Sequence, residues 1–135
     1  MVATQRYPEM FDGVIAAAPA YRVPLAAIDG IGHTQAFISI APTGDDGKPD
    51  LGNALSRDEL KLIASGILDE CYAADGIKDG MVQNTAACKF DPAVLSCREG
   101  QNSACLPAAK VDVLKRVFAG TKNSKGEVIY FGMAL

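Results

Sequence analysis

The chain has 135 residues, the size of a single globular domain and enough to bury a hydrophobic core. Hydrophobic residues make up 49% and charged residues 21%, and the net charge is −3. Without a basic stripe, nucleic-acid binding is not expected, and no apolar run reaches the ~18 residues of a membrane-spanning helix. Residues 1–8 lack the apolar centre of a signal peptide, so the chain is either intracellular or has its export signal outside this sequence.

The first twenty residues differ from the rest of the chain. Residues 1–7 are predicted to be the end of a helix that Pro8 stops. The apolar run at residues 14–18 is predicted to form a short strand buried on both faces. Such a strand needs neighbouring strands, and this chain offers few candidates. The pattern therefore indicates that the chain is part of a larger protein.

The next two helix predictions differ in strength. Residues 24–41 give a weaker helix prediction because Gly30 and Gly32 interrupt the apolar positions, and residues 42–53 are predicted to be a polar loop. The clearest helix spans residues 57–71, with Ser56 as N-cap and Glu59 completing a capping box. Apolar side chains recur along it at helical spacing and should face the core: Leu60, Ile63, Ile67 and Cys71.

The last third of the chain predicts two more helices. A short one begins at Asp91, and a longer one spans residues 107–119. Three apolar side chains share one face of the longer helix: Val111, Leu114 and Phe118. Gly120 can close that helix in the left-handed conformation, and residues 128–131 are a candidate strand.

All four cysteines lie in the segment from residue 71 to residue 105. They allow three pairings, of which we favour the pairing of neighbours, Cys71 with Cys88 and Cys97 with Cys105. Closing the longer loop of about 17 residues contributes roughly 3 kcal/mol in the chain-entropy model. The even count favours disulfides and export, and four buried free thiols are the alternative. No C-x-x-C pair is present, so a zinc site is not indicated.

Two Asp-Gly pairs lie inside the longer cysteine loop and suggest a cation site. Asp75 and Asp79 are close enough in sequence for both carboxylates to point into one tight loop, and the backbone carbonyls of Ile77 and Met81 can join them. Hard cations such as calcium take several oxygen ligands at once. The alternative is a pair of solvated turns, the commoner meaning of Asp-Gly in local sequence. The EF-hand pattern is absent.

The chain offers no complete set of catalytic residues. His33 is a candidate base, but no G-x-S-x-G serine accompanies it, and Thr34 alone is no nucleophile. A structural role is therefore the expected one for His33.

Together these motifs resemble the tannase and feruloyl esterase family of α/β-hydrolases. Residues 3–20 (A-T-Q-R-Y-P-E-M-F-D-G-V-I-A-A-A-P-A) look like the segment just after the family's nucleophile elbow. Residues 71–80 resemble its calcium loop, C-D-x-x-D-G-x-x-D-G, and both cysteine spacings fit disulfides of its lid domain. Later landmarks follow at residues 89–92 (K-F-D-P), 104–106 (A-C-L) and 119–120 (A-G), so the resemblance covers nearly the whole chain.

The resemblance implies an α/β-hydrolase fragment. Residues 1–20 would be a short α/β core remnant, a helix end and a buried strand, and residues 21–135 a mainly helical, loop-rich, disulfide-braced part of the lid insertion. The family's serine, in a G-C-S-x-G-G elbow, would lie before Met1, and its aspartate and histidine beyond Leu135. No catalytic residue is then expected in this chain, which should be inactive alone.

The resemblance also implies a structural calcium ion held by Asp75, Ile77, Asp79 and Met81, with Ile77 and Met81 binding through backbone carbonyls. The family aspartate directly after the cysteine is Tyr72 here, and the loss of one carboxylate should weaken calcium binding.

The function implied by the resemblance is that of a secreted or periplasmic serine esterase that cleaves small aromatic-acid esters, such as ferulates or gallates. Individual substrate contacts are not assigned. Two alternatives stay open: a stand-alone binding module stabilised by calcium and disulfides, without catalysis, and an intracellular domain with free thiols.

Overall fold

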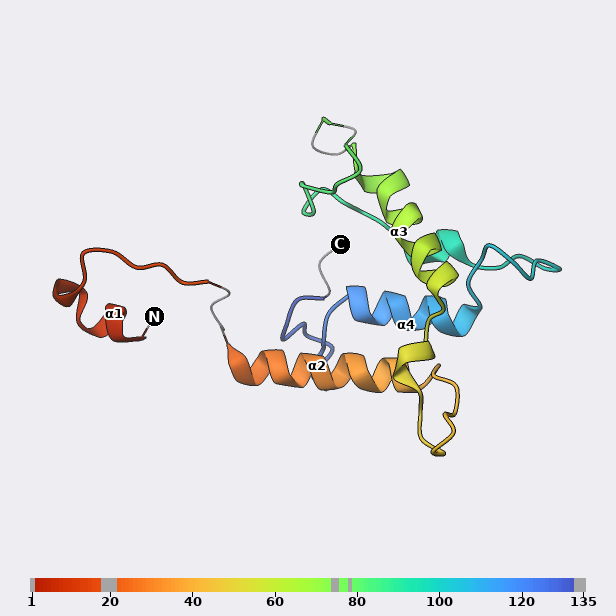
Figure 1. Ribbon diagram of the computed structural model, residues 1–135, viewed down its shortest axis with the longest axis horizontal. Helices are drawn as coiled ribbons and strands as arrows, with labels where there is room; N and C mark the ends of the chain where they lie inside the picture. Colours follow the sequence, from red (N-terminus) through yellow and green to blue (C-terminus); the bar gives the residue numbers. More distant parts are fainter. Residues whose placement is uncertain (1, 18–21, 74–75, 78, 133–135) are drawn as a thin grey trace.

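The computed structural model of the chain describes residues 2–17, 22–73, 76–77 and 79–132. Three helices form the main part of the fold. They are α2 (Val23–Ile38), α3 (Arg57–Cys71) and α4 (Ala108–Phe118). Shorter elements are helix α1 (Val2–Arg6) and three 3-10 turns, η1 (Pro8–Met10), η2 (Leu51–Asn53) and η3 (Pro92–Leu95). Helix α4 packs against α2 along one side, and η3 contacts both α3 and α4 (Figure 1).

The N-terminal segment lies away from these helices (Figure 1). The predicted helix end is present as α1, and Pro8 begins the 3-10 turn that follows it. The predicted strand is wrong for residues 14–17, which have no regular secondary structure and are exposed, with Ile15 at 99%. The last residue of that prediction, Ala18, lies outside the described residues. A strand obtains its backbone hydrogen bonds from a neighbour, and the described part of the chain contains no β-strand to pair with it.

Helix α3 begins and ends at the predicted residues because its local signals are strong. The Glu59 N–H donates to Ser56 Oγ at 3.2 Å, and the Ser56 N–H donates to the Glu59 carboxylate at 2.7 Å, which completes the predicted capping box. Ile63 and Cys71 are buried as expected. The prediction for Leu60 is wrong, since this side chain is 50% exposed. The hydrophobic core begins one turn later along α3, at Ile63.

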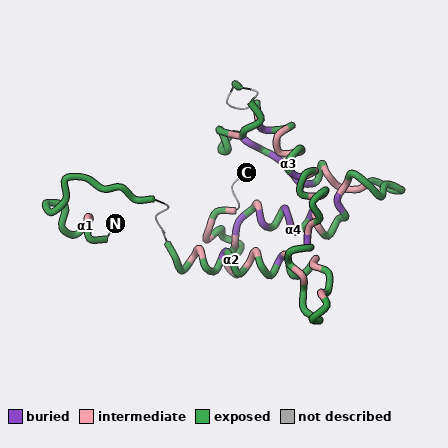
Figure 2. The backbone as a smooth tube through the Cα atoms, viewed as in Figure 1, coloured by how far each residue is buried: buried purple, intermediate pink, exposed green. Residues whose placement is uncertain are grey.

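Helix α4 is shared by two hydrophobic clusters. Val111 and Leu114 pack with Ile63 and Leu106 on the side of α3. The opposite side of α4 packs against α2 through a second set of buried side chains: Ala36, Val113 and Val117. Figure 2 shows this burial concentrated along α4. The sequence pattern predicts one apolar face for this helix, whereas packing between two neighbours requires two.

An ion pair joins the start of α3 to the first turn of α4. Lys110 Nζ donates to both carboxylate oxygens of Glu59 at 2.7 Å, and both side chains are partly buried. Burial raises the pKa of Glu59, but the hydrogen bonds and charge of Lys110, together with the bonds to Ser56, hold that pKa below its ordinary value of 4.5. The pair therefore stabilises the fold above the ordinary pKa, and this contribution is lost as the pH falls through the lowered one.

Two disulfides brace the structure, Cys71–Cys88 and Cys97–Cys105, so no cysteine remains free. These are the neighbour pairs favoured by the sequence. The first bond is buried and packs against Phe90, where it ties the end of α3 to the segment before η3. None of the described helices is both long and apolar enough to cross a lipid bilayer.

The segment after α4 folds back over the end of that helix. Gly120 has a φ of +80°, which confirms the predicted left-handed cap. A Cβ on Gly120 would collide with the backbone of Tyr130, so the position also needs a glycine for space. The predicted strand at residues 128–131 is wrong, because Val128 makes only an isolated bridge to Lys122.

Candidate functional site

The loop after α3 contains the predicted calcium ligands. Asp75 lies outside the described residues, while Ile77, Asp79 and Met81 are exposed along the loop. Asp79 Oδ1 accepts a hydrogen bond from the Met81 N–H at 2.9 Å. The described residues of the loop thus offer one carboxylate and the carbonyls of Ile77 and Met81. Across the described part of the chain, no group of three or more acidic, histidine or cysteine side chains is placed to hold a metal ion.

Two glycines of this loop have left-handed backbone conformations. Gly76 and Gly80 have φ values of +88° and +81°, which glycine adopts without strain. The Cys71–Cys88 disulfide holds the two ends of the loop together. Tyr72, where the family pattern has an aspartate, is half-buried and forms the C-cap of α3. The predicted ligand set itself stays a prediction.

A second polar cluster joins α2 to the segment after α4. His33 Nε2 lies 3.5 Å from Oδ1 of Asp29, one turn earlier on α2. The Thr121 hydroxyl donates to the same oxygen at 2.6 Å, and Asp29 is only 7% exposed. Sequence reasoning assigned His33 a structural role but missed both partners. Thr121 lies 92 residues from Asp29, and no local pattern links the two.

This cluster lacks the geometry of a nucleophile and its base. The Thr34 hydroxyl, next to His33 in sequence, donates to the Gly30 carbonyl at 2.8 Å and is held within α2. No described serine shares a hydrogen bond with His33, whose Nε2 is buried without a hydrogen-bond partner. The arrangement places a histidine beside a buried carboxylate but does not activate a hydroxyl group.

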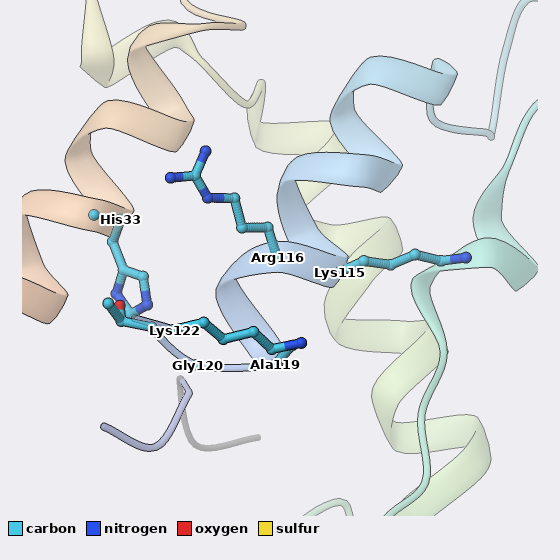
Figure 3. A pocket seen from close by; sticks show the side chains of 8 residues that line it. His33, Lys115, Arg116, Ala119, Gly120 and Lys122 are labelled. Atoms are coloured by element: carbon cyan, nitrogen blue, oxygen red, sulfur yellow. The ribbon is translucent and has the colours of Figure 1, made fainter. Parts of the chain in front are cut away.

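A cavity of about 520 Å³ opens beside His33, between α2 and the end of α4 (Figure 3). Its walls are basic or small and include no carboxylate: Gly32, His33, Lys115, Arg116, Ala119, Gly120, Thr121 and Lys122. Sequence reasoning did not single out these cations, because two come from the end of a helix and one from the following turn.

Comparison with known proteins identifies the lineage. Residues 1–135 match the family model described as tannase and feruloyl esterase. The chain belongs to this family. The family expected from the motifs is thereby confirmed, and the chain comes from a lineage of ester hydrolases.

Individual relatives in this family are longer than the chain. Mono(2-hydroxyethyl) terephthalate hydrolase of Piscinibacter sakaiensis is 37% identical over 142 residues, covering 96% of this chain and 24% of the relative. A probable feruloyl esterase B-2 of Aspergillus flavus is 27% identical, covering 94% and 23%. The crystal structure of feruloyl esterase B from Aspergillus oryzae matches with a TM-score of 0.70 and 27% identity, covering 98% of this chain and 25% of that one. The chain thus spans about a quarter of the length of these relatives.

Proposed function

We propose that this chain is the lid portion of a carboxylic ester hydrolase that cleaves esters of aromatic acids. The observation that carries the proposal is the family match along all 135 residues. The relatives' names refer to esters of ferulic and terephthalic acid, both aromatic acids. A helical, disulfide-braced architecture without a described β-strand suits a covering element better than a catalytic core.

In this proposal the chemistry is performed outside the chain. A serine attacks the ester carbonyl, a histidine carries the proton to the leaving alcohol, and backbone amides bind the oxyanion. The lid, residues 21–135, covers that site, and residues 1–20 belong to the hydrolase core. The two disulfides are typical of exported proteins, and they support a secreted or periplasmic location.

The test compares the purified 135-residue chain with the full-length protein that contains it. Methyl ferulate and propyl gallate serve as aromatic substrates, and methyl butyrate as an aliphatic control. We expect the full-length protein to hydrolyse the aromatic esters with the higher kcat/KM, and the isolated chain to give no turnover above buffer. Turnover by the isolated chain, or a full-length protein that leaves both aromatic esters intact, would contradict the proposal.

We further propose that the loop of residues 75–81 binds a structural calcium ion. The carboxylates of Asp75 and Asp79 and the carbonyls of Ile77 and Met81 would hold it, with water completing the coordination. The exposed Asp79 carboxylate and the two left-handed glycines support this donor set. The bound ion would brace the loop and take no part in ester cleavage.

Calcium should raise the melting temperature, because an ion that binds only the folded state stabilises it. At a free calcium concentration of about 100 times the Kd, this stabilisation is about 2.7 kcal/mol. We expect it in the unmodified protein and in the control Asp112→Asn, which removes an exposed carboxylate from α4. It should be largely absent in Asp79→Asn. Thermal unfolding with calcium and with a chelator measures the difference, and an equal shift in Asp79→Asn would remove Asp79 from the site.

A further inference from the structure

The cavity between α2 and the end of α4 concentrates positive charge in an otherwise acidic chain. Three cationic side chains line it within the short stretch from residue 115 to residue 122, although the whole chain has a net charge of −3. Lys115 has a partner elsewhere, since its Nζ lies 3.5 Å from Asp91 Oδ1. Within the described part of the chain, no carboxylate pairs with the side chains of Arg116 or Lys122.

The cationic side chains that line the cavity extend in different directions. Arg116 extends from α4 toward the side where His33 and α2 lie, whereas Lys115 extends the opposite way (Figure 3). Lys122 starts beside His33 and extends, in this view, the same way as Lys115, so that its ammonium group ends near Ala119 and Gly120 (Figure 3). Arg116, Lys122 and His33 thus line the cavity from different sides. His33 Nε2 lies 3.5 Å from Oδ1 of buried Asp29, and the same oxygen accepts a hydrogen bond from the Thr121 hydroxyl. His33 therefore stands between a buried carboxylate and the cavity that it lines.

We propose that this cavity binds a small oxyanion, a carboxylate or phosphate group, through Arg116, Lys122 and His33. The planar guanidinium group of arginine matches two oxygens of either group, and a second cation nearby strengthens the contact. The volume of about 520 Å³ lies within the range of about 300–1,000 Å³ typical of small-molecule sites. Small residues on the walls, Gly32, Ala119 and Gly120, leave room for such a group.

A competing explanation assigns the same cations to the helix end. Lys115 and Arg116 lie in the last turn of α4, where positive charge is favourable beside the exposed carbonyls. That explanation predicts a loss of thermal stability on removing Arg116, and no saturable binding of anions. It also gives no role to Lys122, which lies beyond the helix, or to His33, which lines the cavity from α2.

The test follows the His33 imidazole resonances by NMR in histidine-labelled protein, and His33→Gln assigns them. His33 is the only histidine of this chain. Inorganic phosphate and benzoate are titrated separately at constant ionic strength, so that general screening stays the same. The double variant Arg116→Gln/Lys122→Gln is compared with a control of equal charge change, Arg57→Gln/Lys125→Gln, whose two residues are exposed and outside the cavity.

We expect a saturable shift of the His33 resonances with at least one probe, and the tighter probe identifies the oxyanion class. The affinity should fall about tenfold or more in Arg116→Gln/Lys122→Gln, because charge-assisted hydrogen bonds are lost, and stay unchanged in the control. The proposal is overturned if neither probe gives a saturable shift, or if both double variants lose affinity equally. Because the readout is binding, the result does not depend on ester hydrolysis.

Discussion

Replacing Leu106 with alanine should lower the free energy of unfolding by about 2–5 kcal/mol. Leu106 is fully buried and packs against Ile63, Val111 and Leu114, so the substitution opens a cavity where α3 and α4 meet. The backbone around it is fixed as well, since its N–H donates to the Leu95 carbonyl at 2.7 Å. The surrounding structure therefore has little freedom to collapse into the space.

The matched control for Leu106→Ala is Leu60→Ala. It removes the same atoms from a side chain that is 50% exposed, and should cost less than about 1 kcal/mol. Denaturant unfolding of both variants, with the midpoint and the slope reported separately, measures the difference. Equal losses would mean that the core does not lie around Leu106 or that Leu60 is covered in the folded protein.

Removing the Cys71–Cys88 disulfide by a double alanine substitution should destabilise the protein by roughly 3 kcal/mol. The bond closes a separation of 17 residues, whereas Cys97–Cys105 closes one of 8. The longer loop restricts the unfolded chain more, and Cys71 is also buried beside Phe90. The same double substitution at Cys97 and Cys105 should therefore cost less.

Melting temperatures of the two double variants, measured with and without a reductant, test this order. Reductant breaks both disulfides of the unmodified protein and the one that each variant retains, so the three proteins should melt at similar temperatures when reduced. A Cys97/Cys105 variant that is as unstable as the Cys71/Cys88 variant would show that loop length does not determine the stabilisation here.

The parts of the fold that the sequence predicts well are determined by residues within one short segment. Helix α3 is specified by Ser56 and Glu59 at its start, and those two residues make both bonds of the capping box. Gly120 likewise closes α4 through its own backbone preference. The family was predictable because the spacings of the cysteine and aspartate residues can be read from the sequence without any knowledge of packing.

The parts that sequence does not predict depend on residues far away in the chain. Helix α2 looks interrupted by Gly32, yet a Cβ there would lie 3.2 Å from the Thr121 hydroxyl that bonds to Asp29, so the glycine makes room for a tertiary contact. The apolar run around Ile15 has the composition of a strand but no described partner strand. The basic cavity is assembled from α2, the end of α4 and the turn after it, so its opposite walls come from segments that are far apart in the sequence.

The position of α4 between two clusters sets a limit for protein engineering. Since Val111 and Leu114 face α3 while Val113 and Val117 face α2, excising either neighbour would strip one flank of α4 of its apolar cover. A grafted or shortened version of the protein therefore has to keep residues 23–118 together as one unit. Residues 2–17, by contrast, contribute no buried side chain to this unit.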